Sequence, residues 1–337
     1  YYPPYLSYLY LAPFSLLLGI KYLLFSGGRE QFIYYLTSDL SQFFLIARFL
    51  NVLMGVASVY LLYRIGKNLF KQEVAALAAA FFLSTSLFHI LMSANGRHWL
   101  PVSFFTILVL WLLNLDWDFR KRYFAVVLAA GIGMGISLIN ALLLALIGYW
   151  YFFYEQRKLP DLFKEKYFYL SLAVFIGLAI LPGILYPQSF GFRADLTSEQ
   201  AKSIWGILQS PILFLKPVAL SEPILAIFAV LGLAVIVLHR SRLFWPLFLF
   251  IYTYSGVFYW FFRYEHRFTL PLFPILALLA GIGFTNLYPH TITSSVKKSP
   301  EERDKNSFGV GVYQRISVKI LKGAFLLILA VPLILSL

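Results

Sequence analysis

The chain consists of long apolar runs separated by short polar loops. A helix needs roughly 20 apolar residues to cross a bilayer core of about 30 Å. Runs near that length are residues 43–62, 74–92, 101–115, 123–139, 141–153, 167–186, 223–238, 245–262, 269–284 and 320–337. Because lipid offers no partners to exposed backbone groups, such runs fold as helices. The pattern predicts an all-α polytopic membrane protein with about ten transmembrane helices.

An earlier apolar run, residues 5–25, has two interpretations. Aromatic rings suit the headgroup level, and prolines interrupt helix geometry. Both kinds of residue are concentrated here, as Tyr1, Tyr2, Tyr5, Tyr8 and Tyr10 and as Pro3, Pro4 and Pro13. We therefore expect an outer juxtamembrane helical segment at the interface. The alternative is an ordinary span with an aromatic belt.

The composition agrees with a membrane protein. Of 337 residues, 60% are hydrophobic and 13% are charged, whereas soluble domains have about 25% charged residues. This excludes an ordinary soluble domain and a disordered chain. The lack of cysteine excludes a disulfide-stapled secreted fold.

The cations orient the predicted helices. Residues 123–153 are too long for one untilted helix, and a hairpin turning near Ser137 and Asn140 makes the charged loops alternate cleanly. Nineteen of the 28 Lys and Arg residues then lie on one side, in loops 64–71, 120–122, 157–166, 240–242 and 297–322. Eight lie on the other side, and Arg48 lies within a span. The positive-inside rule places the larger set in the cytoplasm. We expect a multi-pass protein of the plasma (inner) membrane, although the rule applies equally to the endoplasmic reticulum membrane. The net charge of +13 is thus mostly topological, and we expect no nucleic-acid partner.

This topology divides the chain into two parts. Residues 1–42 form an outer juxtamembrane segment and loop, and residues 43–337 form a multi-span domain. That domain contains an outer loop at 187–222 and a cytoplasmic connector at 285–319. The chain starts with Tyr1 and ends at Leu337 inside an apolar run, so we expect an internal portion of a longer protein.

Two outer loops contain clustered polar and aromatic residues. In residues 93–101, Arg97 can bind a phosphate, His98 follows it, and Trp99 can pack on a sugar or an acyl chain. An interfacial anchor is the alternative for this loop. In residues 263–268, Arg263 and Arg267 can form a clamp for an anionic headgroup, with Glu265 orienting one of them. A loop of salt bridges is the alternative there.

Other signals are less specific. Arg48, near Asn51, either snorkels or makes an interhelical hydrogen bond, or it contacts a ligand. Lys216 is a further candidate in the outer connector. Gly131, Gly133 and Gly135 indicate close helix packing rather than nucleotide binding, because no strand precedes them. No pair of histidines has zinc-site spacing, so no metal ligand is assigned.

Four segments, taken in order, support a family assignment. Residues 2–9 (YPPYLSYL) are similar to a PPL-type motif, and residues 47–70 to an R-x-x-N/S…G…Y-x-x-x-R-x-L-F span. Residues 93–105 match a loop that often has an acidic residue before Pro and Phe-Phe, and residues 267–274 (RFTLPLFP) match an RYxLPLxP motif. Together these segments resemble the GT-C glycosyltransferases that use polyprenyl-phosphate sugars, such as protein O-mannosyltransferases and lipid A aminoarabinose transferases.

The resemblance implies a GT-C fold and an inverting sugar transfer on the extracytoplasmic face. The partners it implies are a polyprenyl-phosphate-linked sugar, membrane lipid and an unidentified acceptor. It implies no organic cofactor and leaves a divalent metal open. The general base of this family is an Asp in a loop upstream of the PPL-type segment, so the catalytic residue is unassigned in this chain. The second acidic position is occupied by Trp99 or His98.

Three functional hypotheses follow. A glycosyltransferase would use Arg97, Arg263 and Arg267 for the lipid phosphate, with Trp99 at the sugar, His98 beside them, and Arg48, Lys216 and Glu265 as further candidates. A transporter or flippase for a lipid-linked or amphipathic substrate should have ionisable or broken-helix sites near mid-membrane. A non-catalytic membrane scaffold is the third hypothesis, because the expected Asp is absent.

Overall fold

The computed structural model describes residues 5–39, 41–164, 166–185, 204–261 and 265–287. Its first half contains α1 (Tyr5–Leu24), α2 (Arg29–Ser38), α3 (Ser41–Phe70), α4 (Glu73–Thr85), α5 (Leu87–Ser93), α6 (Trp99–Leu113), α7 (Phe119–Ile136), the 3₁₀ turn η1 (Leu138–Leu142), α8 (Leu143–Tyr149) and the π-helical turn η2 (Trp150–Tyr154). Its second half contains α9 (Leu159–Lys164), α10 (Lys166–Leu185), α11 (Ile204–Ser221), α12 (Pro223–Leu238), α13 (Phe244–Phe261), the 3₁₀ segment η5 (His266–Leu272) and α14 (Phe273–Leu287). The described residues form no strand, so the all-α prediction is confirmed for them. The predicted span 320–337 and most of the connector 285–319 lie outside the described residues.

The number of spans stays a prediction. Three helical segments are long and apolar enough to cross a membrane: Tyr5–Leu24, Phe43–Phe70 and His266–Leu287. A fourth is the pair α4 and α5, if the two helices form one span bent by 61°. The predicted span 74–92 was wrong as a single helix, because Ser86 interrupts it.

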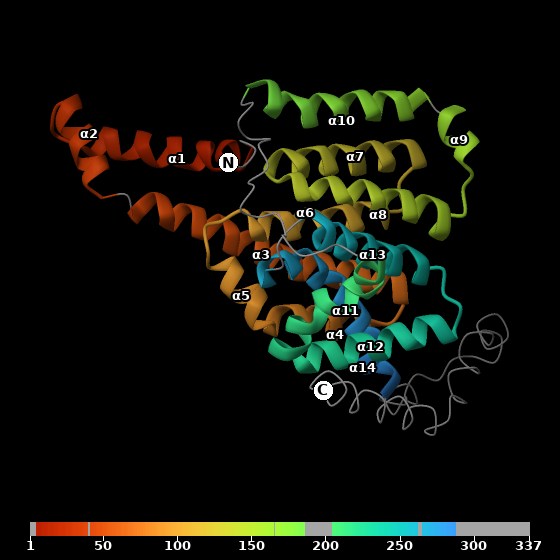
Figure 1. The fold of residues 1–337 in the computed structure, drawn as a ribbon. Helices are drawn as coiled ribbons and strands as arrows, with labels where there is room; N and C mark the ends of the chain where they lie inside the picture. The colour runs from red at the N-terminus through yellow and green to blue at the C-terminus, as the bar shows by residue number, and fades with distance from the viewer. Residues whose placement is uncertain (1–4, 40, 165, 186–203, 262–264, 288–337) are drawn as a thin grey trace, which may run out of the picture.

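The helices pack in a continuous series. The contacts run from α10 to α7, α6, α3, α4, α14 and α12, and Figure 1 shows α10 at the top of the view, α7, α6 and α3 below it, and α4, α12 and α14 towards the bottom. Helix α14 is the most enclosed of the candidate spans, with 83% of its apolar window buried. The core therefore lies around α14 and its neighbours rather than in a layer shared equally by all helices.

Small residues bring the backbones around α14 close together. A methyl group added at Gly232 of α12 or Gly283 of α14 would overlap the carbonyl of Leu279 or Phe228. Gly281 has the same relation to Ala75 of α4. Membrane helices use such residues because lipid supplies no hydrophobic drive for association, and close packing replaces it.

One stripe of α3 is buried. Ala47, Asn51, Gly55, Ser58 and Leu62 are all inaccessible or nearly so, and their spacing of three or four residues keeps them on one helix face. Large apolar side chains elsewhere on α3, such as Phe49 and Val56, are more than 60% exposed in the isolated chain. This exposure is what a lipid-facing surface requires.

The predicted hairpin within residues 123–153 is confirmed. Helix α7 ends at Ile136, η1 contains Asn140, and α8 returns beside α7. The Asn140 side chain donates to the carbonyl of Gly133 at 2.9 Å, which supplies a partner at the end of α7. The three glycines of α7 do serve packing: methyl groups there would meet Leu178, Phe105 and Tyr5.

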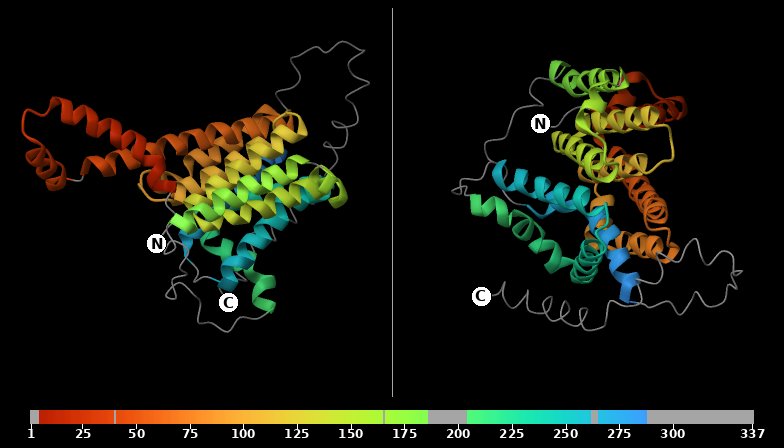
Figure 2. Two further views of the ribbon diagram at one scale, coloured as in Figure 1. Left: turned by 90° about the horizontal axis from the view of Figure 1, so that it is seen from above. Right: turned by 90° about the vertical axis from the view of Figure 1, so that its right-hand side faces the viewer.

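Helices α1 and α2 project from one end of the bundle (Figures 1 and 2). Helix α1 contacts α3 and α7, and its tyrosines make the polar contacts: Tyr5 donates to the carbonyl of Leu178 and Tyr10 to Asn51. Only 6% of its apolar window is buried. Both interpretations of residues 5–25, interfacial segment and span, therefore stay predictions.

The second half of the predicted outer loop 187–222 is helix α11, and the assignment of this segment to an outer loop stays a prediction. Pro211 and Pro217 lie inside this helix. Phe214 packs against Tyr254 and Phe258 of α13, and this burial outweighs the helix-breaking tendency of the prolines. Residues 187–203 lie outside the described residues.

Candidate functional site

Two ends of the bundle carry distinct polar clusters. We call the end with residues 93–98 and 265–268 the predicted outer end, and the end with Lys71, Arg122 and Arg157 the predicted cytoplasmic end. Lys71 follows the end of α3 and is twenty positions after Asn51, which corresponds to about 30 Å of helix. The candidate site is at the predicted outer end.

Asn51 fixes the loop that carries Arg97. Its side-chain nitrogen donates to the carbonyls of Asn95 and Arg97, at 2.5 and 2.8 Å, and its oxygen accepts from Tyr10 at 2.7 Å. Asn51 is fully buried, so the carbonyls would lose their partners if it were removed. The interhelical hydrogen bond expected near Arg48 is therefore made by Asn51, which accepts from Tyr10 of α1.

Glycines let the same loop approach α3. A methyl group at Gly96 would lie 3.1 Å from the Ala47 side chain, and one at Gly55 would lie 2.5 Å from the Ser93 hydroxyl. Ala47, Asn51 and Gly55 are four residues apart on one face of α3. This spacing explains the R-x-x-N…G pattern in physical terms. Ala47, Asn51 and Gly55 lie on one face of α3 and together hold the loop of residues 93–97 against it.

The three residues at the end of that loop differ in exposure. Arg97 is exposed, whereas His98 and Trp99 are 4% and 3% exposed at the start of α6. The His98 and Trp99 rings lie 4.3 Å apart. Arg97 is thus available to a ligand, while His98 and Trp99 form the layer behind it.

Segment η5 brings Arg267 to this loop. The Arg267 guanidinium lies 5.5 Å from the centre of the Trp99 ring, and Trp99 packs edge-on against Phe268 at 5.1 Å. Glu265 forms an ion pair with Arg267, and both side chains are one-third exposed. The fold therefore joins both predicted outer loops, and the orienting role of Glu265 stays a prediction. The sugar-facing role of Trp99 stays a prediction, because its ring faces Arg267 and Phe268.

Two prolines explain the conformation of η5 and its attachment. Pro271 lacks the N–H that would reach the carbonyl of Phe268, and Pro274 lacks the one that would reach Leu270. Hydroxyls from other helices bind both carbonyls: Tyr254 donates to Phe268 at 2.9 Å, and Ser103 donates at 3.2 Å to Leu270, which also accepts from the N–H of Phe273. The RFTLPLFP segment is consequently tied to α13 and α6.

Burial and the neighbouring guanidiniums keep His98 neutral. Burial is the largest cause, Arg267 and Arg97 add to it, and together they lower the pKa of His98 to about 3. A neutral imidazole beside two cations leaves the positive charge of this end on the arginines. That charge distribution suits an anionic group in front of Arg97 and Arg267.

Glu222 was not predicted as a site residue, yet it organises the neighbouring helix break. Its carboxylate accepts from the Ser86 hydroxyl at 2.8 Å and from the N–H of Phe88 at 3.0 Å. Phe88 stacks on His266 at 4.3 Å, next to Arg267 in sequence. The run Ser84, Thr85 and Ser86 inside an apolar stretch was the available sequence signal for the break.

Other predicted residues are placed less closely. Arg48 is exposed on α3, and its backbone nitrogen lies 3.5 Å from where a Gly96 methyl group would be. Lys216 is exposed on α11, and Arg263 lies outside the described residues. Among the described residues, no three His, Asp or Glu side chains come together as a metal site requires.

Comparison with known proteins agrees with this architecture. The sequence model of the dolichyl-phosphate-mannose-protein mannosyltransferase family matches residues 30–186. Two crystal structures of ArnT from Cupriavidus metallidurans superpose on the chain. The apo structure has a TM-score of 0.52 and 16% identity, and covers 78% of this chain and 48% of ArnT. The structure bound to undecaprenyl phosphate has a TM-score of 0.51 and 18% identity, and covers 79% and 49%.

The chain shares the fold of ArnT. The resemblance stated from the four sequence segments is thereby confirmed, and the chain is an integral membrane protein. It spans about half the length of the ArnT chains it matches. No curated protein matches the sequence.

Proposed function

We propose that this chain forms the membrane part of a glycosyltransferase that uses a polyprenyl-phosphate-linked sugar. It transfers the sugar with inversion to an acceptor on the extracytoplasmic face of the plasma (inner) membrane. The observation that carries this proposal is that Arg267 lies over the buried Trp99 ring and that Arg97 and Arg267, from two distant segments, both act on the buried His98. ArnT, which shares the fold, has been crystallised with undecaprenyl phosphate.

The two arginines suit the leaving group of such a reaction. An acceptor hydroxyl attacks the anomeric carbon, the bond from that carbon to the phosphate oxygen breaks, and the polyprenyl phosphate departs with the negative charge. Guanidiniums held beside the departing oxygen stabilise that charge as it develops. A carboxylate acting as general base takes the hydroxyl proton, and the resemblance assigns it to an Asp upstream of the PPL-type segment.

Trp99 and Glu265 hold Arg267 for this role. Glu265 pairs with Nε of Arg267, and the Trp99 ring lies 5.5 Å below the guanidinium. A planar guanidinium held in this way can meet two phosphate oxygens with paired N–H groups. Lys at this position would keep the charge and lose the paired geometry. Arg263 and Lys216 are proposed as further contacts to the donor.

The test measures donor-phosphate binding in the purified membrane protein. Arg267→Gln should weaken the binding of undecaprenyl phosphate by at least tenfold, as loss of a charge-assisted hydrogen bond predicts. The affinity of Arg267→Lys should lie between those of Arg267→Gln and the wild type. Arg29→Gln, at an exposed cation of α2, is the matched control and should bind as the wild type does. Equal affinities of wild type and Arg267→Gln would reject the assignment.

Activity separates the proposed transferase from the other two hypotheses. A transferase should release polyprenyl phosphate from a labelled donor only when acceptor is present, and Arg267→Gln should slow that release. Movement of intact donor between leaflets, without release, would indicate a flippase. Binding of the donor with neither outcome would indicate a scaffold.

A further inference from the structure

The predicted cytoplasmic end contains a polar cavity of about 710 Å³. The ends of α3, α6 and η2 and the start of α7 meet there. Its charged lining comprises three cations, Lys71, Arg122 and Arg157, and two carboxylates, Asp116 and Glu155. It lies at the opposite end of α3 from Asn51, so it is separate from the proposed donor site.

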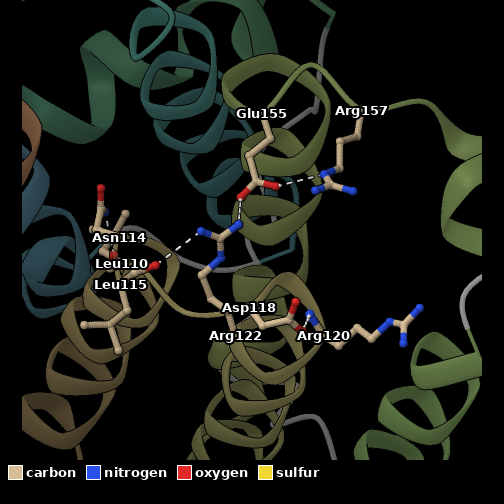
Figure 3. A network of polar contacts seen from close by, with 8 residues as sticks. All are labelled: Leu110, Asn114, Leu115, Asp118, Arg120, Arg122, Glu155 and Arg157. Atoms are coloured by element: carbon tan, nitrogen blue, oxygen red, sulfur yellow. Dashed lines mark hydrogen bonds and ion pairs between the residues drawn. The ribbon is translucent and has the colours of Figure 1, made fainter.

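Arg122 and Glu155 form the fixed frame of this cavity (Figure 3). One terminal nitrogen of Arg122 donates to Glu155 at 2.8 Å, and the other donates to the carbonyl of Leu115 at 3.2 Å. The two side chains are only 18% and 11% exposed. Arg122 and Glu155 neutralise each other, and Arg122 also binds the connection between α6 and α7, so this pair is not available to a ligand.

Arg157 is held differently. Its Nε lies 3.4 Å from the second oxygen of Glu155, and its guanidinium carbon lies 3.8 Å from the centre of the Phe119 ring. The side chain is nevertheless 41% exposed. Glu155 occupies the Nε edge of the Arg157 guanidinium and Phe119 covers one of its faces. Its two terminal nitrogens make no ion pair with a described residue. A guanidinium fixed in this way is prepared for two oxygens of a phosphate.

Lys71 supplies a second exposed cation to the same cavity. It follows the last residue of α3 in a left-handed conformation, with φ of 54°, and its N–H donates to the carbonyl of Lys67. Leu69, Leu113 and Leu115 also contribute to the lining. The cavity thus combines cations with apolar walls, as a lipid headgroup and its glycerol carbons require.

We propose that this cavity binds the phosphate group of an anionic phosphate ester, supplied by the surrounding leaflet as a phospholipid headgroup. Arg157 provides the paired contact, Lys71 provides the second charge, and the Arg122–Glu155 pair keeps the walls in place. Basic pockets between helices on the cytoplasmic side attract anionic headgroups, and the predicted topology places this end there. A soluble phosphate ester has the same chemistry and is the other source to be tested.

The experiment uses the purified protein after removal of lipid. Native mass spectrometry would measure retention of dioleoyl phosphatidylglycerol, with dioleoyl phosphatidylcholine, a zwitterion without net charge, as the reference and sn-glycerol 3-phosphate as the soluble probe. Arg157→Gln and Lys71→Asn should each lower phosphatidylglycerol affinity about tenfold. Asn suits Lys71 because it tolerates the left-handed conformation, and Lys71 takes no part in the Glu155 contacts.

Two matched controls make the outcome decisive. Lys121→Gln removes an exposed cation of the same end outside the cavity, and Arg29→Gln removes an exposed cation of α2, away from both proposed sites. Both should retain phosphatidylglycerol as the wild type does. Binding of glycerol phosphate that depends on Arg157 would support the site with a soluble source. Equal affinity for both lipids, or equal losses in Lys121→Gln, would overturn the proposal.

Discussion

The two polar ends of this helix bundle are anchored by different chemistry. At the predicted outer end, a neutral amide, Asn51, holds the loop that presents Arg97. At the predicted cytoplasmic end, an ion pair, Arg122 with Glu155, holds the helix ends that present Arg157. At the cytoplasmic end the presented arginine, Arg157, lies on the Phe119 ring, whereas at the outer end the ring contact is made by a second arginine, Arg267, over Trp99.

The difference concerns the cost of burial. A buried amide that makes all its hydrogen bonds is inexpensive, whereas a buried ion pair must recover the hydration of two charges. Glu155 shows this cost: burial raises its pKa, and Arg122 and Arg157 offset the effect only in part. The ionic anchor should therefore respond strongly to removal of one partner, and the neutral anchor less so.

The largest expected effect comes from breaking the ionic anchor. Arg122→Met leaves the Glu155 carboxylate buried without its closest partner, and we expect a loss of about 3 kcal/mol in the free energy of unfolding. The measurement is thermal unfolding in detergent at fixed pH. Arg122→Met/Glu155→Leu should recover most of the loss, since a buried pair replaced by apolar groups is often neutral. If Lys121→Met lowers the free energy of unfolding as much as Arg122→Met does, the Arg122–Glu155 ion pair does not stabilise this end specifically.

A smaller effect should follow from removing the neutral anchor. Asn51→Leu leaves the carbonyls of Asn95 and Arg97 and the hydroxyl of Tyr10 without their partners, at a cost of about 2 kcal/mol. It should also weaken undecaprenyl phosphate binding, because Arg97 loses its support. Asn286→Leu is the control, since Asn286 donates to Ile282 within its own helix. Unchanged donor binding in Asn51→Leu would show that Asn51 does not support the donor site.

The smallest expected effect is a pH dependence at the outer end. Below pH 6.5 the unfolded chain protonates His98, while the folded chain, with its pKa of about 3, does not. Stability is therefore lost as pH falls, and between pH 7.5 and 5.5 the loss from His98 is about 1.4 kcal/mol. His98→Gln should show a correspondingly shallower decline in unfolding free energy. Identical slopes for variant and wild type would mean that His98 is not held neutral.

The sequence was sufficient where local patterns decide the structure. Apolar run length predicted the helices, charge alternation predicted the hairpin at Ser137 and Asn140, and glycine spacing predicted close packing. It failed where a distant contact overrides a local rule. Helix α11 was not predicted within the outer loop, because the packing of Phe214 on α13 is not visible in the segment itself. The break at Ser86 was missed for the same reason, since Glu222, which accepts from the Ser86 hydroxyl, lies 136 residues away.

The candidate site divides in the same way. The sequence by itself determined which loops hold arginine, histidine and tryptophan, because charges avoid lipid and collect at the ends of apolar runs. Only the tertiary structure decided that Arg267 lies over Trp99, 168 residues away, and that Asn51 supports Arg97. The physical reason is that hydropathy depends on each residue alone, whereas a binding site depends on which helix ends the packing of small residues brings together.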